Sequence, residues 1–503
     1  MVHVRTVRTA SGATAVQIVF SNRGGKRRIE HIGSAHDDVE LELLKTVARQ
    51  KMLAGQGELD LGLQPPPDAG GPLPVTSSRM GHLVDALLAG YRHLGLDVVT
   101  DGDEVFCGLV LARIIEPTSK LDSLRVLSEV GIEPPGYRTV MRRLPVFAAE
   151  TWRTSLSSAY AANATLGPKH LVLYDVSTLY FETDQGDGFR EPGFSKERRL
   201  EPQITIGLLT DADGFPLRVE AFEGNRAETA TMLPTLRSFM AAHRLTEITV
   251  VADAGMVSDT NKKAIEADGL SFILGARIPF VPYVIDAWRK AHPGQEPLDN
   301  QIWVQPVPAS ASDGRKDHTI IYQYRADRAR RTLKGIDEQV VKARRAVDGK
   351  APVKRNRFIQ ITGGERTLNQ ELIDKARALA GIKGYVTNLP QPSPDVIIGA
   401  YHQLWRIEKA FRMSKHDLQA RPIYHHLRES IEAHLTVVTA ALAVSKWIET
   451  TTGWSIRRFV KTTRRYRSFT IQAGDHTITA AEPVPADLNT ALEAIRERAR
   501  AGQ

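Results

Sequence analysis

The sequence lacks the features of a secreted or membrane-spanning protein. A single cysteine, Cys107, excludes an intramolecular disulfide framework. The N-terminal segment carries basic residues but no continuous apolar stretch, so we expect no signal peptide. The most apolar segment, residues 433–449, runs for only about a dozen residues before Lys446, too few to cross a bilayer. We expect a cytoplasmic protein without a membrane partner.

The chain also lacks internal repeats and long low-complexity tracts, and its composition is that of a folded protein. Hydrophobic residues make up 42% and charged residues 25% of its 503 positions, a length that suggests about three domains. The 66 Lys and Arg exceed the 58 Asp and Glu, which gives a net charge of +8. Such a surplus often accompanies polyanionic partners, although a basic protein without such a partner has the same charge.

Periodicity and turn residues divide the chain into parts. We predict an N-terminal β-hairpin plus helix (1–62), a Pro- and Gly-rich linker (63–77), a helical domain (78–167), an α/β domain in two segments (168–278 and 382–450), an insertion domain between them (279–381) and a basic tail (451–503). The hairpin turn is expected at Asn22–Gly25. In the helical domain, Arg138, Arg142 and Arg143 follow a Gly- and Pro-containing break, which suits either a DNA-binding helix or ordinary helical packing.

The α/β domain has a readable order of elements. Residues 171–183 form a strand, and residues 203–224 form two more around an Asp213-Gly214 turn. A helix, a strand, a second helix and a second strand follow up to residue 278. Antiparallel strands followed by parallel strands with crossover helices predict a mixed sheet flanked by helices.

Two aspartates occupy unusual positions in these strands. Asp175 lies within the apolar run "LVLYDVSTLYF", and Asp253 ends the strand "ITVVAD". An ionised carboxylate in an apolar strand costs several kcal/mol unless it is paired. A single aspartate at a strand end is commonly a turn residue, but two on one sheet favour a shared divalent cation.

A third acid lies on a helix expected from about residue 394 to 418. Glu408 lies beside the apolar stripe of this helix, and Arg412 and Lys415 share its face, with Tyr401 two turns earlier. A surface helix with Glu-Arg pairs has the same pattern. If the three acids converge, however, their oxygens suit two Mg²⁺ ions about 3.5–4 Å apart, a site for cleaving phosphodiesters.

This arrangement resembles the DDE transposases of the insertion-sequence-4 type, whose catalytic domain has a ribonuclease H-like fold. Their last catalytic helix carries Tyr, Arg, Glu and Lys at fixed spacing; Tyr401, Glu408 and Lys415 match, whereas Leu404 stands in place of the arginine. Residues 222–229, "FEGNRAET", also look like the Gly-Asn turn after the third strand of these enzymes.

The resemblance implies metal-dependent nicking at the ends of a mobile element, followed by strand transfer into target DNA. It implies Asp175, Asp253 and Glu408 as catalytic metal ligands, two Mg²⁺ ions with Mn²⁺ as a substitute, and a homodimer on double-stranded DNA with terminal inverted repeats. Because the insertion domain of such enzymes touches the element's end, Trp303 is either a base-stacking residue or a buried structural one.

Basic residues without an intervening acid cluster between Ser455 and Phe469. This strip can neutralise phosphates, or it can be a solvated basic strand. The residues that we predict to contact DNA here are Arg457, Arg458, Lys461, Arg464 and Arg465.

Two other functions fit parts of the pattern. "YDVST" is similar to the nucleophile loop of haloacid-dehalogenase phosphohydrolases, but Ser177 stands where that loop has a second aspartate. A transposase-derived DNA-binding protein without catalysis would keep the basic surfaces. Retention of all three acids argues against it, and the missing arginine leaves it open.

Overall fold

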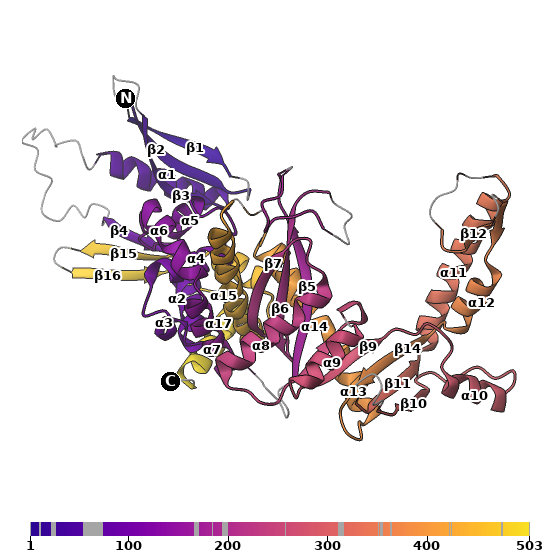
Figure 1. Cartoon of the computed structure of the whole chain (residues 1–503). Coiled ribbons are helices and arrows are strands. Elements are labelled where there is room, and N and C mark those ends of the chain that lie inside the picture. The colour runs from indigo at the N-terminus through magenta and orange to yellow at the C-terminus, as the bar shows by residue number, and fades with distance from the viewer. Residues whose placement is uncertain are drawn as a thin grey trace, which may run out of the picture. The chain divides into compact units, whose positions relative to one another are not determined.

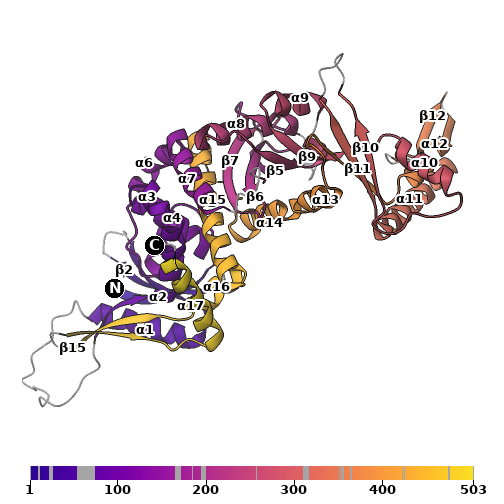
Figure 2. The same ribbon diagram turned by 90° about the horizontal axis from the view of Figure 1, so that it is seen from below.

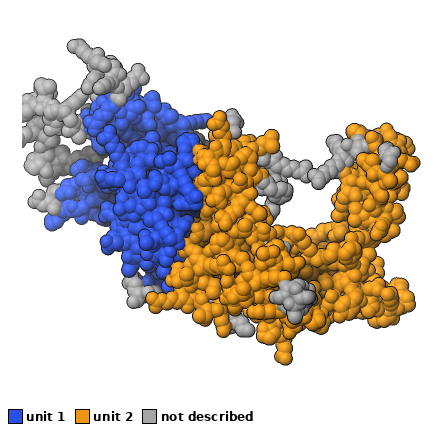
Figure 3. Space-filling view, viewed as in Figure 1, with its two compact units in different colours: residues 1–163, 411–503 blue, residues 164–410 orange. Residues whose placement is uncertain are grey.

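The computed structural model describes residues 2–9, 12–21, 27–53, 74–164, 171–183, 185–193, 200–256, 258–309, 316–350, 352, 356–362, 365–421, 423, 425–473 and 476–501. Two compact units make up the chain (Figure 3). Unit 1 comprises Met1–Asn163 and Phe411–Gln503, and unit 2 comprises Ala164–Ala410. The predicted turn at Asn22–Gly25 and most of the predicted linker lie outside the described residues.

Unit 1 begins with an antiparallel sheet in the order β1-β2-β3. Its strands are β1 (Val2–Arg8), β2 (Thr14–Ser21) and β3 (Arg27–Ala35), and helix α1 (Asp38–Leu53) packs on them. Val16 and Ile18 alternate along β2 and are fully buried together with Leu44 and Ala48 of α1. Apolar residues two positions apart in β2 and four positions apart in α1 therefore form one small core.

The rest of unit 1 is mostly helical and contains one more small sheet. Its helices are α2 (Gly81–His93), α3 (Leu96–Val99), α4 (Glu104–Ile115), α5 (Asp122–Glu129), α6 (Tyr137–Ala148), α7 (Glu150–Asn163), α15 (Arg428–Thr452), α16 (Ile456–Thr463) and α17 (Ala486–Ala501). A second antiparallel sheet has the order β16-β15-β4, from β4 (Val75–Arg79), β15 (Ser468–Ala473) and β16 (His476–Ala481).

Helix α15 is the centre of unit 1. It contacts α2, α4, α6 and α17 within the unit. By length and composition α15 could cross a membrane, but 89% of its most apolar window is buried inside the protein. Because α15 is buried on nearly all sides, apolar residues occur on all of its faces.

Unit 2 is built on a mixed sheet of eight strands in the order β10-β11-β14-β9-β8-β5-β6-β7. The strands are β5 (Leu171–Tyr180), β6 (Gln203–Asp211), β7 (Pro216–Glu223), β8 (Thr249–Ala252), β9 (Ser271–Ala276), β10 (Ile302–Val307), β11 (His318–Tyr324) and β14 (Ile382–Thr387). As predicted, β5, β6 and β7 are antiparallel neighbours, and β8 is parallel to β5 and β9.

Helices cover both faces of this sheet. Helices α8 (Met232–His243) and α9 (Asp259–Ala267) lie over one face, and α13 (Pro394–His402) and α14 (Leu404–Arg412) over the other (Figures 1 and 2). Helix α8 contacts β6 and β7, and α13 contacts β8, β9 and β14. Unit 2 is therefore a mixed α/β domain, as the sequence predicted.

The segment predicted as a separate insertion is only partly separate. Strand β10 pairs with β11, and β11 pairs with β14, so they extend the central sheet by two strands instead of interrupting it. Helix α10 (Tyr283–Ala291) packs on β10. A second cluster is formed by α11 (Ala326–Val347), α12 (Gln370–Ala378) and the hairpin of β12 (Ile359–Thr362) and β13 (Glu365–Leu368), with Phe358 fully buried between them.

Candidate active site

The two aspartates lie at neighbouring strands of the sheet. Strands β5 and β8 run parallel, and their last paired residues are Leu173 and Val251. Asp175 lies two residues further along β5. Asp253 follows directly after β8, where the strand opens into a loop. Strands β5 and β8 are thus adjacent in one sheet, and the shared metal site of the two acids stays a prediction.

Asp175 lies on the face of the sheet opposite to α8. Its neighbour Tyr174 is fully buried, and its hydroxyl donates to Thr231 Oγ1 at 3.0 Å, just before α8 begins. Because side chains alternate along a strand, Asp175 is on the other face. Asp175 Oδ1 accepts a hydrogen bond of 2.8 Å from the amide of Val176.

Tyr401, near the end of α13, holds Asp253. Its hydroxyl donates a short hydrogen bond to Asp253 Oδ1. Burial and, next, this bond to a carboxylate raise the pKa of Tyr401, so the phenol stays protonated and remains a donor. A methyl group at Gly275 on β9 would lie 2.8 Å from the Tyr401 hydroxyl and 2.9 Å from the Ala254 amide nitrogen. Glycine at this position makes room for the contact.

Lys383 is part of this cluster, although the sequence analysis did not select it. Its ammonium lies 4.3 Å from the centroid of the Tyr401 ring. Burial lowers the pKa of Lys383, whereas Asp253 and Glu408 raise it, so the cation lies in the field of both acids. The available signal was a lysine in the otherwise apolar segment "KGYVTNL", the same kind of signal that identified Asp175.

Glu408 is exposed on α14 and joins the cluster electrostatically. Its charge also raises the pKa of Tyr401, after the larger effects of burial and Asp253. In the described part of the chain, no three His, Cys, Asp or Glu side chains are close enough to hold a metal ion together. Asp253 and Glu408 thus share Lys383 and Tyr401 as neighbours, and the three predicted acids do not surround a common metal position in this conformation.

The predicted helix of residues 394–418 is divided into three pieces. Around Gln403, hydrogen bonds between residues three apart, Gln403 to Ala400 and Arg406 to Gln403, separate α13 from α14. Residues Met413–Asp417 then form a π-helical turn. The prediction of one regular helix was therefore wrong, and Tyr401 lies on a different helix from Glu408. Tyr401 reaches the site because α13 packs on β8 and β9.

Leu404 and Arg406 have structural roles in α14. Leu404, which replaces the family arginine, is buried. Arg406 pairs with Asp213, and its Nη1 donates to the Ala212 carbonyl at 3.1 Å. A methyl group at Gly214, whose φ is +76°, would lie 2.9 Å from the Arg406 carbonyl oxygen. Through these contacts Arg406 connects α14 to the β6–β7 turn, and it does not substitute for the missing arginine.

The structure places the remaining predicted residues in different surroundings. Arg412 is exposed and Lys415 half-buried, and both belong to unit 1. Trp303 is 7% exposed in a core cluster with Tyr322 and meets Trp288 edge-on at 5.8 Å. This position matches a buried structural tryptophan and leaves little ring surface for a base; its stacking role stays a prediction.

The basic strip near the C-terminus forms helix α16, so the strand alternative was wrong. Ser455 caps the helix by accepting from the Arg458 amide at 3.3 Å. Arg457, Lys461 and Arg465 are exposed, whereas Arg464 is buried and pairs with Glu116 at 3.0 Å. Arg458 is exposed, lies 3.8 Å over the Trp454 ring and pairs with Asp487 at 3.3 Å.

Comparison with known proteins identifies the class to which this fold and these residues correspond. A family model described as the transposase DDE domain matches residues 167–444, more than half of the chain, and the chain belongs to this family. The matched region contains Asp175, Asp253 and Glu408.

Among solved structures, the chain is similar to a piggyBac transposase in a synaptic complex with hairpin DNA. The identity is 10% and the TM-score 0.36, over 76% of this chain and 70% of that chain. No match was found among curated proteins.

Proposed function

We propose that this protein is a transposase of the insertion-sequence-4 type with a ribonuclease H-like catalytic domain. It would cut DNA at the ends of a mobile element and join the freed ends to target DNA. The observation that carries the proposal is the parallel pairing of β5 with β8, because Asp175 lies on the first strand and Asp253 follows directly after the second. Glu408 supports it, because its charge and that of Asp253 act on the same lysine, Lys383.

Asp175, Asp253 and Glu408 are the proposed metal ligands, and their chemistry fits the ion. Carboxylate oxygens are the ligands that Mg²⁺ prefers, and Mn²⁺ accepts the same set. Two such ions, when bound, stabilise the attacking and the leaving oxygens of a phosphodiester. Glu408 would complete the set by a change of side-chain conformation, since it is exposed on α14.

Both nicking and strand transfer would require the proposed metal ligands to hold the DNA in position. In the nicking step a water oxygen bonds to phosphorus as the 3′ oxygen leaves, giving a 3′-hydroxyl and a 5′-phosphate. In strand transfer that 3′-hydroxyl attacks a target phosphodiester and displaces another 3′ oxygen. Tyr401 would keep Asp253 in place during both steps through its hydrogen bond.

The proposal includes the expected partners and location. Double-stranded DNA with terminal inverted repeats and target DNA are the substrates, and a homodimer on DNA in the cytoplasm is the expected assembly. Exposed basic residues that would contact DNA include Arg412, Arg457 and Lys461. Phosphate contacts of this kind fix the position of DNA without reading its sequence.

Cleavage of end DNA tests the proposal. Labelled terminal-repeat DNA is incubated with Mg²⁺ or Mn²⁺ and with wild type, Asp175→Asn, Asp253→Asn or Glu408→Gln. We expect DNA binding to persist in all three variants and cleavage to fall by at least about a hundredfold, as is typical when a group central to transition-state stabilisation is removed. Asp286→Asn is the matched control, because Asp286 is half-exposed and pairs only with a surface lysine, Lys290. Unchanged cleavage in any of the three variants would reject the site.

The DNA cleavage experiment, together with a phosphomonoesterase assay of the same proteins, separates the two alternatives. Binding of end DNA without metal-dependent nicking by wild type would indicate a DNA-binding protein that has lost catalysis. Hydrolysis of a small phosphomonoester that is lost in Asp175→Asn, with no DNA cleavage, would indicate a haloacid-dehalogenase-like enzyme. Ser177 in place of the second aspartate of that loop disfavours the latter outcome.

A further inference from the structure

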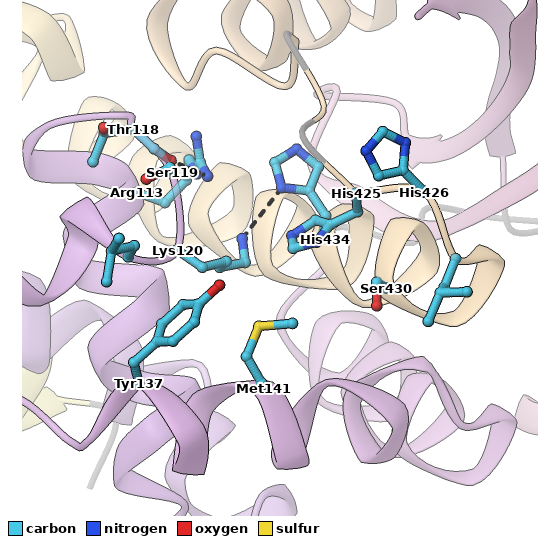
Figure 4. A pocket seen from close by; sticks show the side chains of 12 residues that line it. Arg113, Thr118, Ser119, Lys120, Tyr137, Met141, His425, His426, Ser430 and His434 are labelled. Carbon is cyan, nitrogen blue, oxygen red and sulfur yellow. Dashed lines mark hydrogen bonds between the residues drawn. The ribbon is translucent and has the colours of Figure 1, made fainter. Parts of the chain in front are cut away.

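Unit 1 contains a pocket that the proposed catalytic site does not use. It has a volume of about 300 Å³, at the lower end of the range in which small ligands bind. Its wall comes from the end of α4, the turn of residues 116–121, one face of α6, and the start of α15 with the residues before it (Figure 4). None of the described residues that line it is acidic.

Two buried cations lie at the base of this pocket. Lys120 and Arg113 are each 5% exposed. The Lys120 ammonium donates to His434 Nδ1 at 3.2 Å, and no carboxylate in the described part of the chain pairs with it. The Arg113 guanidinium donates to the Thr118 carbonyl at 2.8 Å and to the Gln419 carbonyl at 3.4 Å. The neutral imidazole of His434 compensates the buried charge of Lys120 only in part, and burial, followed by the charge of Arg113, lowers the pKa of Lys120 well below its usual value. An anion beside Lys120 would therefore favour its charged form.

Two histidines lie beside these basic side chains. His434 Nε2 lies 3.0 Å from the Ala420 carbonyl, so this nitrogen carries the proton and Nδ1 accepts from Lys120. Burial and then Lys120 and Arg113 lower the pKa of His434 far below its usual value. The same causes lower the pKa of His425 to about 4. Burial is thus the main reason that both imidazoles stay neutral, and the neighbouring basic groups act in the same direction.

The rim of the pocket extends the positive surface. Tyr137 and Met141 of α6 line the pocket, and the residues that follow each of them, Arg138 and Arg142, are exposed. Ser430, in the first turn of the long helix α15, also lines it. A helix N-terminus carries partial positive charge, so it adds to the field of the two cations. An anion that continues beyond the pocket would therefore meet further positive charge.

We propose that this pocket binds a phosphate group of the DNA backbone, with Lys120 as its central cation and Tyr137 and His426 at its edge. The inference rests on the proposed function for the identity of the polyanion. The preference for DNA over a free phosphate comes from the exposed arginines of α6, which a chain of phosphates can reach together with the pocket.

Thermal unfolding with inorganic phosphate tests the pocket itself. Phosphate should raise Tm relative to chloride at equal ionic strength, because a ligand that binds only the folded state stabilises it. Lys120→Gln should abolish this rise without lowering Tm in chloride, since it removes an unbalanced buried charge. Lys120→Arg should retain the rise. Lys51→Gln is the matched control, because Lys51 is exposed and pairs with Glu30; it should behave as wild type.

Duplex DNA binding across a salt series tests the source of the phosphate. Lys120→Gln should make the slope of log K against log salt shallower by about one, the effect of one lost phosphate contact, and Lys51→Gln should not. Using the Asp175→Asn protein throughout keeps this result independent of cleavage. No phosphate effect on Tm, or a Lys120→Gln protein that is less stable yet still protected by phosphate, would overturn the pocket. A phosphate effect without any change in the DNA slope would overturn DNA as the source.

Discussion

At the scale of single residues, Lys383 explains how a group of acids can exist in the folded chain without a metal. Carboxylates brought close together repel one another, and the cost rises as water is excluded. Lys383 offsets part of that cost, because Asp253 and Glu408 both stabilise its charged form against burial. The same charge, however, competes with any divalent cation for the acids.

Replacing Lys383 by methionine should therefore strengthen metal binding. Loss of one positive charge beside the acids should lower the Mn²⁺ concentration for half-saturation by roughly tenfold, the order expected for a neighbouring unit charge at partial burial. Titration of Mn²⁺ by electron paramagnetic resonance measures the free ion directly. Lys290→Met, at an exposed position, is the control. Weaker Mn²⁺ binding by Lys383→Met would show that the lysine organises the ligands and does not compete with the metal.

Glu129 in unit 1 is the buried acid on which several elements depend. Its carboxylate accepts from His31 at 2.8 Å and Ser34 at 2.6 Å on β3, and it also pairs with Arg125. Burial alone would raise the pKa of Glu129, but these partners outweigh it and hold the pKa at about 2. The folded state thus favours the ionised form. Its contribution to stability is complete above the usual carboxyl pKa and is lost as pH falls toward 2.

We expect Glu129→Gln to lower the free energy of unfolding by about 3 kcal/mol at neutral pH, because Arg125 and Arg464 lose one of their acidic partners and keep Glu116. The difference from wild type should shrink as pH is lowered from about 4.5 toward 2. Urea unfolding at a series of pH values measures both effects. Glu42→Gln, at an exposed position on α1, should leave stability unchanged. A pH-independent difference would mean that packing, and not charge, makes Glu129 important.

At the scale of elements, helix α16 divides one basic strip into two roles. Its apolar residues Ile456 and Phe459 are buried, so the helix has an inner and an outer face. Arg464 is on the inner side with Glu116, whereas Arg457 and Lys461, four residues apart, are on the outer face. Arg457 and Lys461 are therefore available to phosphates, whereas Arg464 is not.

Substitutions in α16 should separate these roles. Arg457→Gln with Lys461→Gln should weaken duplex DNA binding and reduce the salt slope by about two, with an unchanged Tm. Arg464→Gln should instead lower Tm by several degrees, because it leaves Glu116 with one cation fewer. Fluorescence anisotropy and thermal unfolding of the same preparations provide the two readouts. An unchanged salt slope in the double variant would remove α16 from the DNA-binding surface.

At the scale of the whole molecule, local patterns predicted more than long-range connections. Asp175 and Asp253 stand out in the sequence because each is an acid within or at the end of an apolar, strand-like run. Lys383 was missed because its place depends on the pairing of β14 with β9, which no local pattern reveals. The extension of the sheet by β10 and β11 was missed for the same reason. The contact of Arg406 with the distant β6–β7 turn, three residues after the break at Gln403, is likewise not visible in any local pattern.

The division of unit 1 between the two ends of the chain has a consequence for folding. Helix α15 packs against α2, α4 and α6, and its residues Ala440, Ala441 and Val444 are fully buried. Residues 1–163 alone would expose the apolar surfaces that α15 covers, and the free energy lost exceeds the marginal stability of a typical domain.

We therefore expect the fragment of residues 1–163 to show no cooperative unfolding transition by itself. Addition of a fragment of residues 411–503 should restore cooperative unfolding and the near-ultraviolet circular dichroism of buried aromatic side chains such as Tyr91 and Phe106. Residues 164–410, which form unit 2 as one continuous segment, serve as the control and should unfold cooperatively alone. A cooperative transition of residues 1–163 in isolation would contradict the central place of α15, because the remaining helices would then form a core without it.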